Sequence, residues 1–398
     1  MDRLSSNRWV EIHLEALEHN VKQIRARMEP ATRLIAVVKA DAYGLGAVEV
    51  AWQLSQLGVD YFAVTFLQEA VELRRHGIEN DILIFSPLGR DEVRTAIENN
   101  FTVTVGSGED LVVVQEVVDA LRRSARIHIK VDTGLGRFGV SEVEAVSLAR
   151  QARSSENILL EGIYTHFAEA GRSRRYTMKQ FDRFMAALAE IDLQGIQIPI
   201  RHCCSSSAFL KYPFMHLDGV RIGTLLGGQM PSGRYEDHPN LKDPYRFRAR
   251  IVSVRTLKKG DYIGYYRTYH LRADTAVAVV PAGFIDGLGV RPVPVPSGRL
   301  ELFKAMAGVL ASYFQSNRTA MKAYVHGKPI YIRGRVFMQF CLAEIPNGLE
   351  VNPGDIVDLP VRRTMVSRFV PRMYTRDGQP GKIEHSLKKV IYTSGEEQ

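Results

Sequence analysis

Several side chains that could do chemistry directly follow the apolar runs of the N-terminal half. Lys39 ends the run at 34–38 (LIAVV), inside VVKADAYGLG. Apolar neighbours would partly desolvate its amine, lower its pKa and favour Schiff-base formation with a carbonyl. A surface lysine at the end of a strand is the alternative, and for Lys39 taken alone it is the stronger interpretation.

Two further cations flank the end of another run. Lys130 and Arg137 lie in KVDTGLGRFG, where Gly134 and Gly136 allow a tight loop close to a ligand. Two cations in one site need an anionic partner or a modification, and a carbamate on Lys130 would turn their repulsion into attraction. The alternative is that Lys130 points outward.

Polar residues after the later runs suggest an anion site. His166 ends YTHF, three serines stand at 205–207, Arg221 lies within the last run, and Gly223 and Thr224 follow it. Hydroxyl and N–H groups after the last two strands of a barrel commonly hold a phosphate. Each signal is weak, and a lone histidine is more often a hydrogen-bonded core residue. Together they predict a site for a phosphorylated, Schiff-base-forming cofactor, pyridoxal phosphate (PLP).

The elements that must position these residues alternate between residue 12 and about 225. Eight β-branched runs alternate with amphipathic stretches such as 68–76, 108–123 and 178–191. The runs are nearly continuously apolar, as in parallel strands covered on both faces. This pattern predicts a (β/α)8 TIM barrel, because an open doubly wound sheet would have five or six strands. The runs cover residues 34–38, 61–65, 82–85, 101–105, 126–131, 159–165, 198–203 and 217–222.

After residue 240 the pattern changes to strands without long helices between them. One helical stretch, 300–314, interrupts it, and Pro and Gly are frequent. We therefore predict an α/β protein with the N-terminal barrel over 9–240 and a β-rich C-terminal domain over 241–398. Residues 1–8 are a candidate for packing with the second domain. The strand-like runs of this half are 248–256, 275–281, 322–335, 336–344 and 355–360.

Composition excludes several classes of protein. The 398 residues are 45% hydrophobic and 24% charged, which is typical of a globular chain and excludes a fibrous or disordered one. The formal net charge is +8, but Lys and Arg are scattered, which favours a solvated surface and no nucleic-acid partner. No signal-peptide core and no long apolar run occur, so we expect a cytoplasmic protein without a membrane partner. The three cysteines fit neither a disulfide framework nor a metal site.

Five motifs, in order along the chain, resemble the alanine racemase family of fold type III PLP enzymes. The likeness covers the whole chain and is strongest from 1 to 290. It implies the same barrel, PLP as cofactor and an amino acid as substrate. The motifs are AVVKADAYGLG at 36–46, HIKVDTGLGRFGV at 128–140, EGIYTHFA at 161–168, VRIGTLLGG at 220–228 and VVPAGFIDGLG at 279–289.

The resemblance also implies roles for single residues. Lys39 would carry PLP as a Schiff base, and Arg221 would face its pyridine nitrogen. Arg137 would hydrogen-bond the phenolic oxygen and help to bind substrate, positioned by a carbamylated Lys130. The backbone N–H of Met338 would hold the substrate carboxylate. The phosphate would be held by Tyr43, Ser206, Gly223 and Thr224.

Tyr265, in GDYIGYYRTY at 260–269, resembles the second catalytic base of the family. Racemisation needs a base on each face of Cα, so Lys39 and Tyr265 form a sensible pair. The resemblance implies that this tyrosine comes from the partner subunit of a homodimer with shared active sites. A tyrosine with a pKa near 10 is only ~0.1% ionised at pH 7, so nearby cations must favour its phenolate. His166 would hydrogen-bond Tyr265 or Arg221. If the register is shifted, two tyrosines are alternatives: Tyr266 and Tyr269.

Four positions depart from the family pattern. Gln339 replaces an aspartate, Phe284 and Arg368 stand where tyrosines are usual, and Ser205 replaces an asparagine. The segment 290–323 is also longer than usual, and 355–371 is shorter. We predict PLP-dependent two-base racemisation, with L-alanine to D-alanine for peptidoglycan as first choice. The alternatives are racemisation of a bulkier or more polar amino acid, such as serine or lysine, and a catalytically degenerate homologue.

Overall fold

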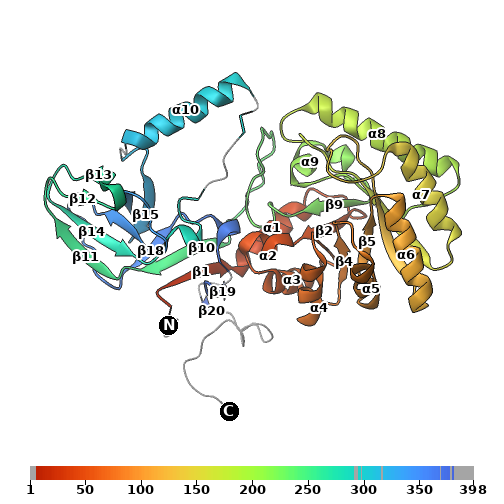
Figure 1. Ribbon diagram of the computed structural model, residues 1–398, viewed down its shortest axis with the longest axis horizontal. Helices are drawn as coiled ribbons and strands as arrows, with labels where there is room; N and C mark the ends of the chain where they lie inside the picture. Colours follow the sequence, from red (N-terminus) through yellow and green to blue (C-terminus); the bar gives the residue numbers. More distant parts are fainter. Residues whose placement is uncertain are drawn as a thin grey trace, which may run out of the picture. The chain divides into compact units, whose positions relative to one another are not determined.

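The computed structural model describes residues 6–290, 295–296, 298–314, 317–367, 369–376 and 379–380, in two units (Figure 1). One unit spans Leu14–Pro244, and the other combines the chain up to His13 with the chain from Tyr245. The barrel therefore begins at Leu14, not at residue 9, and ends at Pro244, not at residue 240. The reason is β1, Arg8–His13, whose ladder partners all lie in the β-rich unit.

The first unit is a barrel of eight parallel strands, as the sequence predicts. Their order is β8-β7-β6-β5-β4-β3-β2-β9. The two end strands meet at a bridge between Cys204 and Val220 and through Arg221 N donating to Cys204 O at 3.0 Å, which nearly closes the barrel. The strands are β2 (Arg33–Val37), β3 (Tyr61–Val64), β4 (Asp81–Ile84), β5 (Thr102–Val105), β6 (Ala125–Lys130), β7 (Ile158–Tyr164), β8 (Ile200–His202) and β9 (Gly219–Ile222).

Helices surround these strands (Figure 1), and several begin at a serine cap. Ser107, Ser141 and Ser173 each accept an N–H three residues ahead, which satisfies one free donor of α6, α7 and α8. The longer helices bury apolar side chains along one face. The helices are α1 (Leu14–Arg25), α2 (Lys39–Gly44), α3 (Ala47–Gln56), α4 (Leu67–Arg75), α5 (Arg90–Glu98), α6 (Gly108–Leu121), α7 (Glu142–Ser154), α8 (Arg174–Leu193) and α9 (Ser206–Lys211).

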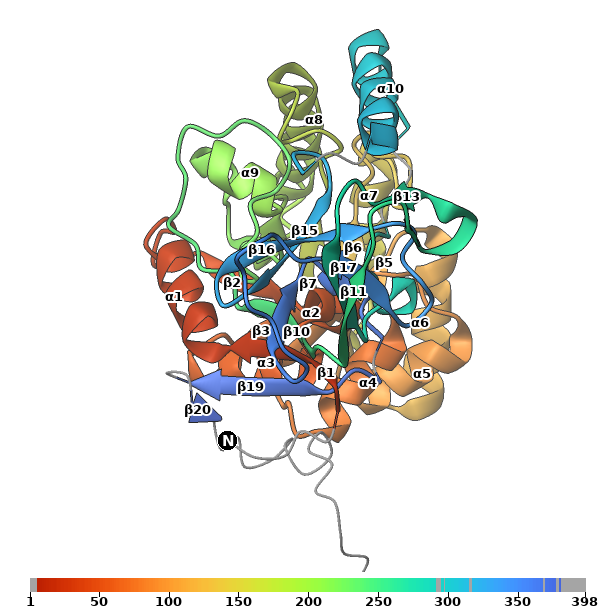
Figure 2. The ribbon, with the colours of Figure 1, turned by 90° about the vertical axis from the view of Figure 1, so that its left-hand side faces the viewer.

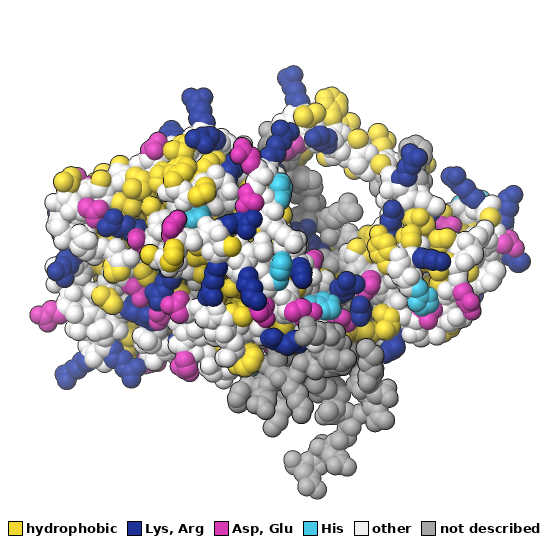
Figure 3. All heavy atoms as spheres, turned by 180° about the vertical axis from the view of Figure 1, so that it is seen from behind, with side chains coloured by type: hydrophobic (Ala, Val, Ile, Leu, Met, Phe, Trp, Pro, Cys, Tyr) yellow, Lys and Arg dark blue, Asp and Glu magenta, His cyan; other side chains and the backbone are white. Residues whose placement is uncertain are grey.

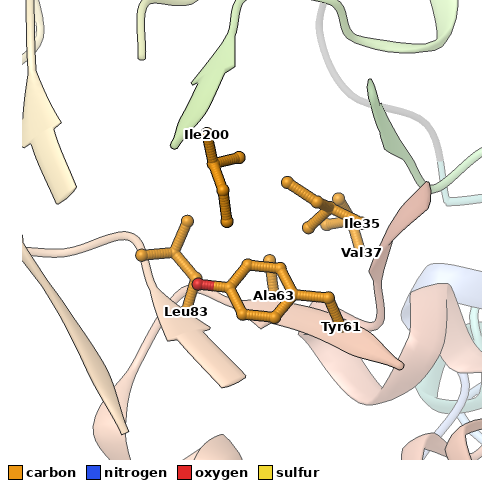
Figure 4. Close-up of a cluster of buried hydrophobic side chains, with 6 residues drawn as sticks. All are labelled: Ile35, Val37, Tyr61, Ala63, Leu83 and Ile200. Atoms are coloured by element: carbon orange, nitrogen blue, oxygen red, sulfur yellow. The ribbon is translucent and has the colours of Figure 1, made fainter. Parts of the chain in front are cut away.

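Side chains fill the barrel interior. Tyr61, Ile35, Leu83 and Ile200 are almost fully buried and, with Val37 and Ala63, form one cluster in which the side chains of four strands converge (Figure 4). An interior packed in this way is a solid core and not a pore. Polar groups at the carboxyl ends of the strands consequently stand above closely packed side chains.

The second unit is built on one sheet of ten strands (Figure 2). The predicted strand at 248–256 is in fact two, interrupted at Ile251, and the run at 322–335 is a hairpin that turns at His326 and Gly327, both with positive φ. The order is β11-β14-β17-β16-β15-β18-β10-β1-β19-β20. The further bounds are β10 (Tyr245–Arg250), β11 (Ser253–Leu257), β14 (Thr275–Val280), β15 (Met321–Val325), β16 (Lys328–Arg333), β17 (Cys341–Glu344), β18 (Ile356–Leu359), β19 (Arg372–Arg376) and β20 (Gln379–Pro380).

Outside this sheet, the described part of the unit has one α-helix, a few 3-10 turns and one small hairpin. The helix α10, Arg299–Phe314, agrees with the predicted stretch, and hydrophobic side chains along it remain exposed (Figure 3). The hairpin joins β12 (Tyr262–Ile263) to β13 (Tyr269–His270), with the short helix η2 (Tyr265–Arg267) between them. Within the described ranges, no helix combines the length and the apolar character needed to cross a membrane.

Candidate active site

The loop after β2 makes a left-handed helical turn. Ala40, Asp41, Ala42 and Tyr43 have φ between 50° and 57° and ψ between 32° and 50°. For residues with a Cβ this conformation costs roughly 1–2 kcal/mol each. The turn is held by Ala42 N donating to Val38 O at 2.8 Å and by Ala47 N donating to the Asp41 carboxylate at 2.9 Å. The turn sets the directions in which two side chains point, that of Lys39 at its start and that of Tyr43 at its end.

Glu69, in the first turn of α4, fastens this left-handed turn from outside. Its carboxylate accepts the N–H of Ala40 at 2.6 Å, and also those of Thr65 and Phe66 at 2.9 and 3.0 Å. Glu69 is not among the site residues that the sequence predicts. The available signal was its place at the third position of a helix, where a carboxylate commonly turns back to cap the preceding amides.

A cavity of about 230 Å³ opens at the carboxyl ends of the barrel strands. All eight cofactor residues that the sequence predicts within the barrel line it, although they come from five separate loops and strand ends. Its lining is Val37, Lys39, Tyr43, Phe85, Arg137, Tyr164, His166, Ser205, Ser206, Ser207, Arg221, Gly223, Thr224 and Pro231.

Lys39 reaches into this cavity with a perturbed amine. Burial and, less strongly, the charge of Arg137 lower the pKa of Lys39, while Glu69 opposes them. This is the direction expected from apolar surroundings. A larger neutral fraction makes the amine a better nucleophile towards a carbonyl and a better base.

One side of the cavity suits a phosphate. The hydroxyl of Thr224 is buried and has no hydrogen-bond partner among the described residues. A Cβ at Gly223 would overlap the Tyr43 hydroxyl, so only glycine leaves this space, and Gly223 N lies 3.4 Å from Ser206 Oγ. Burial and the charge of Glu69 raise the pKa of Tyr43 to about 12, which keeps its hydroxyl a donor. The cradle therefore offers uncharged donors and one unsatisfied hydroxyl, which fits the phosphate of PLP.

Unlike the uncharged phosphate cradle, Arg221 brings a positive charge to the cavity. Its side chain is almost fully buried, with the residue only 3% exposed. Its Nη1 lies 2.9 Å from His202 Nδ1, and its Nη2 donates to Thr165 O at 2.7 Å and to Cys203 O at 3.1 Å. Nη2 also lies 3.4 Å from Nδ1 of His166. Arg221 is one of the two hydrogen-bond partners that the sequence predicts for this histidine. Burial and then Arg221 hold the pKa of both imidazoles well below 6.5, so both are neutral.

Lys130 is buried, so the outward-pointing alternative is wrong. It is 1% exposed, and its Nζ donates to Val131 O at 3.0 Å. The same Nζ lies 5.2 Å from the centre of the Tyr164 ring, which lines the cavity. Burial and then Arg221 lower the pKa of Lys130 to about 7. The lowered pKa favours the neutral amine, the form that reacts with carbon dioxide.

The loop that carries Arg137 is shaped by one carboxylate. Asp132 accepts the amides of Gly134, Leu135 and Gly136 at 2.9, 2.8 and 2.9 Å. Although burial alone would raise it, these three bonds lower the pKa of Asp132. Both Gly134 and Gly136 have positive φ, which explains the glycines of this motif.

Tyr265 and Met338 belong to the β-rich unit. Tyr265 is 65% exposed, and its ring meets that of Phe337 edge-on at 5.0 Å. The neighbouring loops are joined by Phe284 N donating to Phe337 O at 2.9 Å and Ile285 N donating to Met338 O at 3.1 Å. Tyr265 and Met338 thus share one surface with Phe284, where the sequence departs from the family. Arg368 lies outside the described residues.

The side chains of the two other tyrosines of this segment make contacts within the β-rich unit. The hydroxyl of Tyr269 donates to Glu344 at 3.0 Å, and burial and that carboxylate raise its pKa. The guanidinium of Arg335 covers the ring of Tyr266 at 4.6 Å. Tyr265 is the one of the three for which neither contact exists among the described residues.

Comparisons with known proteins agree along the chain. Residues 12–231 match the model of the alanine racemase N-terminal domain, and residues 245–368 match that of the alanine racemase C-terminal domain. The chain is 34% identical over 352 residues to alanine racemase of Methanococcus maripaludis, covering 88% of this chain and 87% of that protein. Alanine racemase of Desulfovibrio desulfuricans is 31% identical over 386 residues, covering 92% and 97%.

Solved structures of similar proteins share the fold over nearly the full length. Alanine racemase of Clostridium difficile 630 has a TM-score of 0.84 at 28% identity, covering 95% of this chain and 98% of that one. The enzyme of Bacillus anthracis with bound L-Ala-P has a TM-score of 0.81 at 26% identity, covering 98% and 100%.

Proposed function

The chain belongs to the alanine racemase family of PLP-dependent racemases, and from this we propose that it interconverts L- and D-alanine by a two-base mechanism. One observation carries the proposal: a cavity that joins a low-pKa lysine, a buried arginine and an unsatisfied phosphate cradle. Alanine is the substrate named in the relatives, and D-alanine for peptidoglycan is the product this role would supply.

PLP, when bound, draws electrons from an attached amino acid and makes its α-proton acidic. Lys39 would hold the cofactor covalently and exchange that proton on one face. Tyr43, Ser206, Gly223 and Thr224 would hold the phosphate. Arg221 would donate to the pyridine nitrogen. Because a guanidinium does not give up its proton, this nitrogen would stay uncharged, which limits side reactions.

Arg137 and Lys130 would act together on the phenolic side of the cofactor. A carbamate on Lys130 would give Arg137 an anionic neighbour and fix its guanidinium towards the phenolic oxygen and the substrate. The backbone N–H of Met338 would receive the substrate carboxylate. The buried amine of Lys130, with its lowered pKa, supports the modification.

The second base would be Tyr265 of the partner subunit in a homodimer. The exposed surface around Tyr265 supports this, because a cluster of large apolar side chains in water marks an interaction site. The exposed members of that cluster are Tyr262, Tyr266, Phe284, Ile285, Met338 and Phe340.

Hybrid dimers would test both the chemistry and the sharing of sites. The holoenzyme is incubated in heavy water with L-alanine, serine and lysine, and loss of the α-proton and formation of the D-isomer are followed. We expect exchange with alanine, and inactivity of the Lys39→Ala and Tyr265→Phe homodimers. Equal mixing of these two variants should restore about a quarter of the wild-type rate, because half of the dimers are hybrids and each hybrid has one intact site. Tyr266→Phe is the control.

Each other outcome has a definite meaning. Full activity of Tyr265→Phe would refute the two-base mechanism, and an inactive mixture would refute shared sites. Exchange with serine or lysine in place of alanine would show that the substrate is one of these amino acids. Phe284→Tyr would then be the first substitution to make, because a tyrosine is usual in the family at this position. If the cofactor-loaded protein exchanges the α-proton of none of these amino acids, the remaining alternative is the catalytically degenerate homologue.

A further inference from the structure

Three buried side chains and the half-buried Glu161 form one hydrogen-bonded chain through the barrel interior. Nη1 of Arg221 lies 2.9 Å from Nδ1 of His202, and Nε2 of His202 lies 3.0 Å from Nδ1 of His128. Nε2 of His128 then lies 3.1 Å from a carboxylate oxygen of Glu161. Both histidines are 0% exposed. The chain links β9, β8, β6 and β7 from the cavity downwards.

Simple chemistry fixes the direction of every link. A guanidinium only donates, a carboxylate only accepts, and a neutral imidazole does one of each. His202 and His128 must therefore both be neutral and carry their protons on Nε2. Burial lowers the pKa of both imidazoles, in agreement with the neutral form. A proton on either ring would set two donors against each other.

Glu161 is anchored as the negative end of this chain. The oxygen that receives His128 also accepts the hydroxyls of Tyr61 at 2.7 Å and Thr102 at 2.9 Å, and Arg126 donates to the other at 3.2 Å. Although burial alone would raise it, these neighbours lower the pKa of Glu161 to about 2. The carboxylate is ionised at every pH at which an enzyme of this kind would work.

The backbone is also shaped for the His128 ring. A Cβ at position 162 would lie 2.5 Å from Cε1 of His128, so glycine alone leaves room for the imidazole between β6 and β7. This observation is independent of the hydrogen bonds. Both point to a ring that is held in one place and one orientation.

We propose that His128 and Glu161 are positioning residues, which fix the tautomer of His202 and thereby aim Arg221 at the pyridine nitrogen of the cofactor. Within the described part of the chain, Arg221 forms no ion pair. The nearest carboxylate along its hydrogen bonds is Glu161, two imidazoles away. A chain of bonds polarised in one direction strengthens each of its links, so the anion supports the buried cation from a distance. The part of this proposal that concerns the cofactor rests on the proposed function.

The test uses Glu161→Gln and His128→Gln holoenzymes, with Thr102→Val as the matched control. Thr102→Val removes another hydrogen bond to the same carboxylate oxygen but leaves the chain intact, whereas the Tyr61 hydroxyl also lies 3.2 Å from Nε2 of His128. The first readout is the tautomer of His202 by 15N NMR of histidine-labelled protein, assigned by its absence in His202→Gln. We expect a single Nε2–H tautomer in the wild type and the control, and a mixed or reversed population in the two chain variants.

The second readout is the pyruvate released per D-alanine formed from L-alanine, which counts turnovers that end in amino transfer. A poorly aimed Arg221 should raise this ratio on the order of fivefold, because one strong hydrogen bond is weakened. An unchanged tautomer and an unchanged ratio in both chain variants would overturn the proposal, as would the same changes in Thr102→Val. If the wild type does not racemise alanine, the proposed function fails, while the NMR result still decides the role of the chain.

Discussion

The left-handed turn after Lys39 predicts an unusual response to glycine. Ala40 is exposed, and its backbone is at φ 50° and ψ 50°, so Ala40→Gly removes a strain of roughly 1–2 kcal/mol without loss of packing. Glycine in turn lowers stability by about 0.5–1 kcal/mol through the greater freedom of the unfolded chain. The net expectation is a stability that is unchanged or raised by up to about 1.5 kcal/mol.

A matched control is Ala186→Gly in the right-handed helix α8. Ala186 is also exposed, and the same substitution there should cost about 1 kcal/mol. The free energy of unfolding should therefore differ between the two variants by about 1–2 kcal/mol, or slightly more, in favour of Ala40→Gly. Urea unfolding of the apoprotein, followed by circular dichroism and by the fluorescence of Trp52 in α3, measures this difference.

The same substitution should weaken function, because the turn directs Lys39 and Tyr43. A more flexible turn would aim both side chains less well, so we expect lower affinity for PLP in Ala40→Gly and unchanged affinity in Ala186→Gly. Equal destabilisation by the two substitutions would refute the left-handed conformation of Ala40. Raised stability with unchanged cofactor affinity would show instead that the strain does not position the site.

Three other predictions concern the phosphate cradle and Glu161. Gly223→Ala should push the Tyr43 ring aside and raise the Kd for PLP at least about tenfold in an absorbance titration, whereas Gly108→Ala, with open space around its Cβ, should not. Thr224→Val removes a hydroxyl without a partner among the described residues, so the apoprotein should unfold at the same or a higher urea concentration while PLP affinity falls about tenfold; a loss of apoprotein stability would contradict this. Because folding lowers the pKa of Glu161 from 4.5 to about 2, its stabilisation, up to about 3 kcal/mol, is fully present above pH 4.5 and lost as the pH falls towards 2. Stability of Glu161→Gln should change less over that range, and parallel curves for variant and wild type would disprove the assignment.

Local pattern was sufficient to predict the barrel. Each of its strands is a short apolar run, and the polar residue that follows such a run stands at the cavity because parallel strands end on the same side. This rule alone predicts that Lys39, His166 and Thr224 stand at the cavity, and all three line it. The order of motifs along the chain then specified their neighbours.

Three features could not be predicted, each for a physical reason. The left-handed turn has no glycine in its first four positions after Lys39, and its conformation is decided by contacts such as that with Glu69, far along the chain. β1 pairs with β10 and β19, whose residues are more than 200 positions away, so its own sequence does not show to which unit it belongs. His128 and His202 lie inside apolar strands, where a polar residue is a visible signal, but their pairing depends on the curvature of the barrel.

The positive charge of the cavity explains why several separate sets of hydrogen bonds hold its residues in place. The lining includes Lys39, Arg137 and Arg221 but no carboxylate, and Nζ of Lys130 lies 5.2 Å from the centre of the Tyr164 ring in that lining. Cations gathered in a poorly solvated space repel one another, and burial together with this repulsion lowers the pKa values of both lysines. The acids that fix the geometry, among them Glu69, act from outside the lining, through backbone amides or intervening side chains. The cavity thus keeps its positive charge for an anionic cofactor and a substrate carboxylate, which would relieve the repulsion that the fold sustains without them.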